Sequence, residues 1–185
     1  MNVIAISGSR NPNGQTNRAL AAFCEGLELK GATVRTVLLP ELKIERCRQC
    51  DANGWGTCRS EGKCVIEDDV HDLTALLKAT DAAVFATPVY FSDLSESLRA
   101  LLDRLRRQCV NEPGRHGIAG KPAIGICVAG GGGGGAPQCC TNLTWTLQTA
   151  HFDVVDVFPV RRQNLANKLD ELKAAGKDWA TVLGG

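Results

Sequence analysis

Four cysteines gather within one short segment of this 185-residue chain, in the spacing C-x2-C-x7-C-x5-C. They are Cys47, Cys50, Cys58 and Cys64, and the segment also holds three glycines and Trp55. Four thiolates on so short a loop can enclose one tetrahedral centre, either a 4Fe–4S cluster or a structural zinc ion. Free or redox-active thiols are the remaining alternative.

A second segment has the chemistry of an anion site. Residues 8–17, which include Ser9, Arg10, Gln15, Thr16 and Asn17, follow an apolar run and precede a helical stretch. Hydroxyls, backbone N–H groups and the positive end of a helix would meet there, which favours a phosphate. The segment lacks the Gly-Lys-Ser/Thr ending of a P-loop. An ordinary polar turn with Thr16 as N-cap is the alternative.

Two more segments offer surface to a flat ring. Pro88-Val89-Tyr90-Phe91 places an aromatic pair after a stiff proline, and Gly130 begins a run of six glycines. Six ordered glycines cost considerable chain entropy, which is reasonable where a backbone must lie close to a ligand or must move. A core-capping role for the aromatic pair and a flexible linker for the glycines are the alternatives.

These segments must be positioned by the elements between them. Hydrophobic periodicity predicts strands over 3–7, 33–39, 82–87, 123–129 and 152–158, and helices over 17–30, 69–80, 92–110, 136–150 and 164–183. Ala82-Ala83-Val84-Phe85-Ala86 is apolar throughout, as expected for a strand buried on both faces. The pattern predicts an α/β fold: a doubly wound, flavodoxin-like parallel sheet of five strands in the order 2-1-3-4-5, with helices on both faces.

One domain is expected over residues 1–185, with a long cysteine-rich insertion at 40–68 after the second strand. In doubly wound sheets ligands bind at the carboxyl ends of the strands. The three ligand-type segments after the first, third and fourth strands all fall at that edge.

Composition excludes several classes of protein. With 44% hydrophobic and 22% charged residues the chain is not disordered, and a net charge of +1 makes nucleic acid a poor partner. No apolar run is long enough to span a bilayer, and the N-terminus does not read as a signal peptide. We therefore expect a cytoplasmic protein, in which nine cysteines favour metal or redox chemistry over a disulfide framework.

Together the motifs resemble the NADPH-dependent FMN reductase superfamily, and most closely its iron–sulfur flavoprotein branch. The resemblance spans roughly residues 3–135 and is carried by Gly8-Ser9-Arg10, Pro88-Val89-Tyr90-Phe91, residues 98–104 and the glycine run. The cysteine segment ends in Cys64-Val65-Ile66-Glu67-Asp68-Asp69, similar to the ending of that branch's cluster motif. Here the gap between the second and third cysteines is five residues longer than the branch's C-x2-C-x2-C-x5-C.

The resemblance implies a set of site residues. FMN phosphate would lie on the first segment, the isoalloxazine along the aromatic one, and the glycine backbone would border the ring: Ser9, Arg10, Gln15, Thr16, Asn17, Pro88, Val89, Tyr90, Phe91, Gly130, Gly131 and Gly132. The cysteines at 47, 50, 58 and 64 would be the metal ligands. No catalytic acid or base is implied.

The function implied is that of an FMN-dependent oxidoreductase. It would pass electrons from NAD(P)H to flavin, a quinone or another small-molecule or protein acceptor, through a 4Fe–4S cluster where the four cysteines hold one, as a homodimer or homotetramer. A non-enzymatic electron carrier and a cysteine-based redox or metal sensor are the alternatives.

The remaining polar and sulfur residues receive plainer interpretations. Four arginines end a predicted helix and are interpreted as a solvated face, or else as a grip on a nucleotide phosphate or a subunit contact: Arg99, Arg104, Arg106 and Arg107. Cys24 and Cys127 are expected in the core. Cys109, Cys139 and Cys140 stay unassigned.

Overall fold

A five-stranded parallel sheet forms the centre of the molecule. The computed structural model describes residues 1–184, and its strands are β1 (Asn2–Ser7), β2 (Thr33–Leu38), β3 (Ala82–Pro88), β4 (Pro122–Ala129) and β5 (Asp153–Arg161). Their order is β2-β1-β3-β4-β5, with every pair parallel. This confirms the predicted fold class and strand order.

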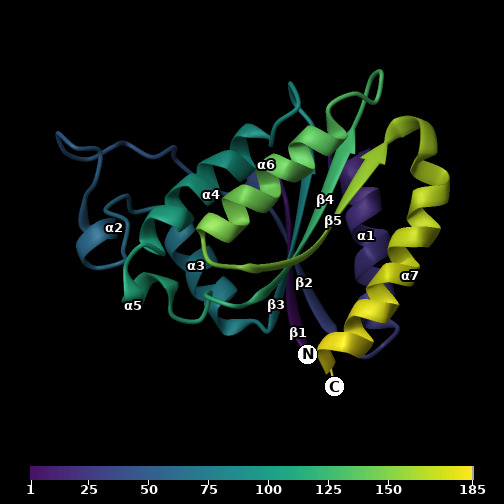
Figure 1. Ribbon diagram of the computed structural model, residues 1–185, viewed down its shortest axis with the longest axis horizontal. Helices are drawn as coiled ribbons and strands as arrows, with labels where there is room; N and C mark the ends of the chain where they lie inside the picture. Colours follow the sequence, from purple (N-terminus) through teal and green to yellow (C-terminus); the bar gives the residue numbers. More distant parts are fainter. Residues whose placement is uncertain (185) are drawn as a thin grey trace.

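The inner strands are apolar on both faces because helices cover both sides of the sheet (Figure 1). The helices are α1 (Gln15–Glu28) and α7 (Leu165–Gly184) on one face, and α3 (Val70–Ala79), α4 (Glu96–Gln108) and α6 (Ala136–Thr149) on the other. Two hydrophobic cores result, with Phe23 and Leu172 in one and Leu101 and Leu143 in the other.

Helices α1 and α7 approach each other closely through two glycines. A Cβ on Gly26 would lie 2.1 Å from the carbonyl oxygen of Lys173, and a Cβ on Gly176 would lie 2.2 Å from that of Phe23. Neither position has room for a side chain. The closure of this helix layer therefore depends on glycine at both sites.

Short helices interrupt the long connections: α2 (Thr57–Ser60), α5 (Glu112–Arg115) and the 3-10 helices η1 (Leu39–Glu41) and η2 (Arg162–Asn164). Residues 40–68, which we call the cysteine loop, extend beyond the sheet beside α4, with α2 within them (Figure 1). Periodicity did not predict these elements because each is only one turn long.

Two predicted helix starts were wrong. The helix expected from Ser92 begins at Glu96, because Phe91 and Ser92 have φ values of 49° and 65° and form a tight turn before it. Helix α1 begins at Gln15 with Gly14 as its N-cap, so Thr16 is not the cap. In both cases a loop residue takes a backbone conformation that the hydrophobic pattern does not reveal.

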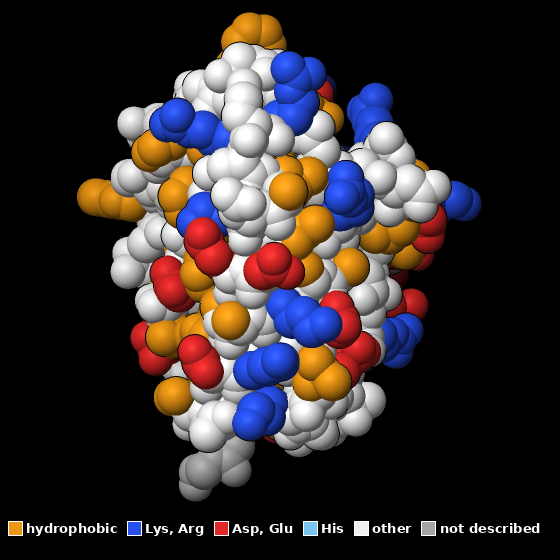
Figure 2. All heavy atoms as spheres, turned by 90° about the vertical axis from the view of Figure 1, so that its right-hand side faces the viewer, with side chains coloured by type: hydrophobic (Ala, Val, Ile, Leu, Met, Phe, Trp, Pro, Cys, Tyr) orange, Lys and Arg blue, Asp and Glu red, His pale blue; other side chains and the backbone are white. Residues whose placement is uncertain are grey.

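The outer surface of the α7 side carries interspersed positive and negative side chains (Figure 2). No large field of one sign appears in that view, which agrees with the chain's net charge of +1. Within residues 1–184, no helix combines the length and the apolar character that crossing a membrane requires.

Candidate cofactor site

A cleft of about 720 Å³ opens at the carboxyl edge of the sheet, where β1, β3 and β4 end. Three loops line it, contributing Ser9, Asn11, Asn13, Gly14, Gln15, Thr16, Arg18, Pro88, Val89, Tyr90, Val128, Ala129, Gly130, Gly131 and Gly134. Its volume lies within the range of small-ligand sites. The three segments singled out in the sequence therefore meet at one place.

The first loop forms a polar cradle at the start of α1. Gly14 precedes the helix, and within the described chain this N-cap makes no side-chain hydrogen bond to the first-turn N–H groups. Those groups and the positive end of the helix dipole are free to hold an anion. Arg18, on the same first turn, lines the cleft and adds a positive side chain. Arg18 is not among the residues predicted for this site, although it lies only three residues after the predicted ligand Gln15.

The internal hydrogen bonds of the first loop fix its shape. The Ser7 hydroxyl donates to Asn17 Oδ1 at 2.5 Å, and Asn17 Nδ2 donates to the carbonyl oxygen of Asn11 at 2.8 Å. A Cβ on Gly8 would lie 2.2 Å from the Ser95 hydroxyl, so the loop presses directly against the start of α4. Asn17, a predicted phosphate ligand, thus braces the loop and does not line the cleft.

Three other predicted residues also lie outside the cleft lining. Arg10 and Phe91 line a neighbouring hollow of about 480 Å³, together with Val89, Tyr90 and Glu96. Val89 and Tyr90 are shared by the hollow and the cleft, so the two spaces adjoin. Gly132 lines neither space, and Gly134 takes a place on the cleft instead.

The segment of residues 88–95, which we call the aromatic turn, contains a tight turn whose two central residues, Phe91 and Ser92, are strained. Tyr90 and Asp93 exchange backbone hydrogen bonds of 3.0 and 2.9 Å, and the two residues between them both have positive φ. Residues other than glycine rarely adopt this backbone conformation, which costs on the order of 1 kcal/mol or more per residue. Phe91 is fully exposed at the tip.

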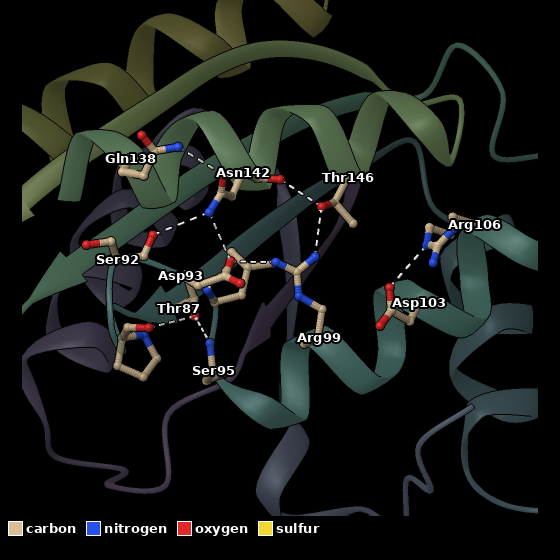
Figure 3. A network of polar contacts seen from close by, with 12 residues as sticks. Thr87, Ser92, Asp93, Ser95, Arg99, Asp103, Arg106, Gln138, Asn142 and Thr146 are labelled. Carbon is tan, nitrogen blue, oxygen red and sulfur yellow. Dashed lines mark hydrogen bonds and ion pairs between the residues drawn. The ribbon is translucent and has the colours of Figure 1, made fainter. Parts of the chain in front are cut away.

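A polar network holds this turn in place (Figure 3). Arg99 of α4 donates to Asp93 Oδ1 at 2.5 Å and to the Thr146 hydroxyl of α6 at 3.2 Å. The Thr87 hydroxyl accepts the backbone N–H of Ser95 at 2.9 Å. Helices α4 and α6 therefore hold the turn from outside, and Arg99, although partly exposed, is engaged in these contacts.

The glycine run leaves room beside the cleft. A Cβ on Gly130 or Gly131 would meet no atom of the described residues within 4 Å, and both glycines line the cleft. Gly131, Gly133 and Gly135 have positive φ, which explains why side chains are excluded at those three positions. The open backbone at residues 130 and 131 suits the edge of a flat ligand.

The four cysteines of the cysteine loop line one small cavity. Cys47, Cys50, Cys58 and Cys64 all line a space of about 20 Å³, together with Arg104 and Arg107. That volume is close to one water-sized sphere, so it admits a single ion and a cubane cluster would require the loop to expand. Within residues 1–184 no three Cys, His, Asp or Glu side chains are arranged to hold a metal ion.

A buried ion pair joins the C-terminal end of the cysteine loop to α4. Arg104 donates to both carboxylate oxygens of Asp68, at 2.6 and 2.9 Å, and its side chain is 1% exposed. Although burial opposes the charge, the guanidinium and the backbone N–H groups of Glu45 and Val70 hold the pKa of Asp68 below its usual range. For Arg104, the interpretation as a solvated helix face is wrong.

The remaining cysteines are largely buried. Burial raises the pKa of Cys24 to about 12 and that of Cys109 to about 11. The thiols of Cys139 and Cys140 beside it, with burial, raise the pKa of Cys127 well above its usual range. Cys24 and Cys127 lie in the core as predicted, and the raised pKa values make these thiols poor nucleophiles.

The sequence matches known proteins along most of its length. Residues 1–168 match the family described as NADPH-dependent FMN reductase. An iron–sulfur flavoprotein of Methanocaldococcus jannaschii is 31% identical over 125 residues, which cover 68% of this chain and 62% of that protein. One of Methanosarcina thermophila is 31% identical over 111 residues, which cover 58% of this chain and 56% of the relative. The chain thus spans less than two thirds of these relatives' length.

Solved structures share the fold. A flavone reductase superposes with a TM-score of 0.73 at 18% identity, covering 100% of this chain and 63% of that one. An NAD(P)H:quinone oxidoreductase from Methanothermobacter marburgensis gives a TM-score of 0.68 at 20% identity, covering 97% and 96%. At these identities the likeness concerns the arrangement of strands and helices.

Proposed function

The chain belongs to the NADPH-dependent FMN reductase family, and on that premise we propose that it is an FMN-dependent oxidoreductase that takes electrons from NAD(P)H. The observation that carries the proposal is the cleft formed by three loops at the carboxyl edge of the sheet. One cleft combines an uncapped helix start, an aromatic turn and a side-chain-free backbone. These are the three surfaces that a phosphate and a flat ring require.

The residues present fit FMN. The phosphate would lie at the start of α1, on the Ser9 hydroxyl, the N–H groups of Gln15 and Thr16, and the positive charge of Arg18. The ring would lie along residues 88–90, with its far edge against Gly130 and Gly131. Asn17 would not contact FMN but would hold the phosphate loop in shape through its hydrogen bond to Asn11. Arg10 and Phe91 would reach the bound FMN only from the adjoining hollow.

When bound, FMN supplies the redox chemistry, which is to accept a hydride from a nicotinamide and to release electrons to an acceptor. This chain's residues bind and orient. Tyr90 and Phe91 are exposed at the cleft and the adjoining hollow, where a nicotinamide or an acceptor ring can stack. Among residues 1–184, the cleft lining includes no Asp, Glu or His, so we assign no proton-transfer residue.

We further propose that the cysteine loop holds a thiolate-ligated metal centre, a 4Fe–4S cluster or a zinc ion. The donor set of four thiols around one cavity supports this, as do the names of the iron–sulfur flavoprotein relatives. Because no three of these side chains within residues 1–184 are arranged to hold an ion, metal binding would draw the thiols closer together. In the proposed oxidoreductase reaction, flavin, a quinone or another small molecule would accept the electrons.

Comparison of FMN with riboflavin tests the flavin site. We expect FMN to bind with fluorescence quenching and more tightly than riboflavin, because only FMN carries the phosphate. Arg18→Ala should reduce the FMN-to-riboflavin affinity ratio about tenfold, in the range of a lost charge-assisted hydrogen bond. Arg106→Ala, which removes an arginine of α4 that lines neither the cleft nor the adjoining hollow, is the matched control and should leave the ratio unchanged. Absence of flavin binding by the wild-type protein contradicts the proposal.

Turnover and metal analysis separate the alternatives. An enzyme should reduce its flavin rapidly with NADH or NADPH, whereas an electron carrier would be reduced slowly by nicotinamides and fast by a ferredoxin-like protein. A metal or thiol sensor would contain zinc or free thiols without flavin. The visible spectrum of anaerobically purified protein reports flavin and iron–sulfur absorption together. Assembly as a dimer or tetramer and a cytoplasmic location stay predictions.

A further inference from the structure

Two arginines, one helical turn apart on α4, hold the cysteine loop from the same side. Besides its ion pair with Asp68, Arg104 donates to the carbonyl oxygen of Glu45 at 3.1 Å and to that of Ile66 at 3.2 Å. Glu45 precedes the first cysteine by two residues, and Ile66 follows the fourth by two. Arg104 therefore ties both ends of the ligand segment to a single buried side chain.

Arg107 holds the middle of the same loop. Its Nη1 donates to the carbonyl oxygen of Gly54 at 2.6 Å, and its guanidinium lies 4.8 Å from the centre of the Trp55 ring. Gly54 and Trp55 belong to the residues by which the second cysteine gap is lengthened. The extended gap is thus held by contacts from α4.

Each of these guanidinium groups, of Arg104 and Arg107, has a buried Nε–H without an acceptor among the described residues. Both side chains line the cavity that the four thiols line. A buried N–H without an acceptor costs on the order of 1–3 kcal/mol, so two at one cavity call for an acceptor there.

We propose that Arg104 and Arg107 donate hydrogen bonds from Nε to the cysteine sulfurs of a metal centre in this loop, and that they hold the loop's backbone beside the cavity where the thiols would gather. The inference rests on the proposed metal centre. Thiolate sulfur accepts hydrogen bonds, and a guanidinium also balances part of the negative charge of four thiolates. Such residues are positioning residues outside the ligand shell, which typically change metal affinity 10- to 100-fold.

Cobalt(II) is the probe for the test, because its sulfur-to-metal absorption bands report thiolate ligation directly. Reduced, metal-free protein is titrated with Co²⁺ under anaerobic conditions. Arg107→Gln should weaken Co²⁺ binding about tenfold and move the charge-transfer band to longer wavelength, because the sulfur loses a hydrogen bond. A purely structural role would not move the band. Arg107→Lys, which keeps the charge, should lose less affinity than Arg107→Gln.

Arg106→Gln is the matched control. Arg106 lies on the same helix and donates to Asp103, and it does not line the cysteine cavity. Its variant should bind Co²⁺ as the wild type does. Hydrogen exchange of residues 47–64 in the metal-free proteins provides a second measurement, and it should be faster in Arg107→Gln than in Arg106→Gln. Arg104→Lys should also weaken Co²⁺ binding and speed the hydrogen exchange of residues 47–64.

The outcomes separate this inference from the proposed function. Equal Co²⁺ affinity and equal band position in Arg107→Gln and Arg106→Gln overturn the inference while leaving the metal centre intact. Absence of thiolate–cobalt bands in the wild-type protein overturns the metal centre and the inference together. Flavin binding measured on the same samples reports the proposed flavin site independently of either result.

Discussion

Arg99 and Asp93 form an ion pair that joins α4 to the aromatic turn, with Nη2 of Arg99 2.5 Å from Oδ1 of Asp93 (Figure 3). The same guanidinium reaches Thr146 on α6, so one side chain connects two helices to the strained turn. Because two positive-φ residues cost energy to maintain, the turn needs such outside contacts to keep its shape.

Arg99→Gln should therefore weaken FMN binding about fivefold, or about 1 kcal/mol, since both partners are partly exposed and the pair is screened by solvent. Flavin fluorescence titration measures the change. Arg106→Gln removes a comparable arginine from α4 away from the turn and should leave the affinity unchanged. An unchanged affinity in Arg99→Gln would show that the turn keeps its shape unaided.

Gly130→Ala and Gly132→Ala form a matched pair at the glycine run. A Cβ meets no described atom within 4 Å at either position, and neither has a positive φ, so the unliganded protein should keep or slightly gain stability. Only Gly130 lines the cleft, and a methyl group there should raise the Kd for FMN about tenfold. Thermal unfolding and flavin titration measure the two effects. Equal flavin affinities would contradict the placement of the ring.

Gly176→Ala should destabilise the protein although it lies far from the cleft. Alanine gains about 1 kcal/mol in helix propensity over glycine. Its Cβ, however, would lie 2.2 Å from the carbonyl oxygen of Phe23, and such overpacking costs typically 1–3 kcal/mol. We expect a net loss of about 1 kcal/mol in the free energy of unfolding. Urea denaturation measures it, with Gly132→Ala as the control for the same chemical change in open space.

Asp68→Asn should destabilise the protein by about 3 kcal/mol at neutral pH, because it leaves Arg104 buried without its anion. The wild-type pKa of Asp68 is lowered, so the stabilisation is present above the ordinary carboxyl pKa and is lost as the pH falls through the lowered value.

The difference in unfolding free energy between wild type and Asp68→Asn should then stay constant from about pH 8 to pH 5 and narrow below about pH 4. Urea denaturation at a series of pH values tests this. Asp103→Asn breaks the partly exposed pair with Arg106 and should cost less than about 1 kcal/mol throughout. If the difference in unfolding free energy between wild type and Asp68→Asn persists unchanged into strong acid, Asp68 is not the titrating group.

The sheet and the three cleft loops could be predicted because their signals are local. Apolar runs such as Ala82-Ala83-Val84 mark buried strands, and polar or glycine-rich segments after them fall at one edge of a parallel sheet. The aromatic turn could not be predicted, because Phe91 and Ser92 are unusual residues for positive φ and the helical pattern of leucines begins directly after them, at Leu94.

The contacts made over long sequence separations were also missed. The interpretation of Arg104 as part of a solvated face is wrong because Arg104 lies three residues after Leu101 and beside Leu105, within the apolar stripe of α4. That spacing was a signal that its side chain is buried. Nothing in the sequence paired it with Asp68, because the ion pair forms only when the cysteine loop folds back along the helix.

Helix α4 contacts the aromatic turn through Arg99 and the cysteine loop through Arg104 and Arg107. From residue 99 to residue 107 the helix advances about 12 Å, at 1.5 Å per residue. The proposed flavin cleft and the proposed metal centre are thus both anchored to one rigid helix, which fixes the distance between their anchoring arginines. An insertion in the cysteine loop, such as its lengthened second gap, can change the loop's shape while these anchoring points stay the same distance apart.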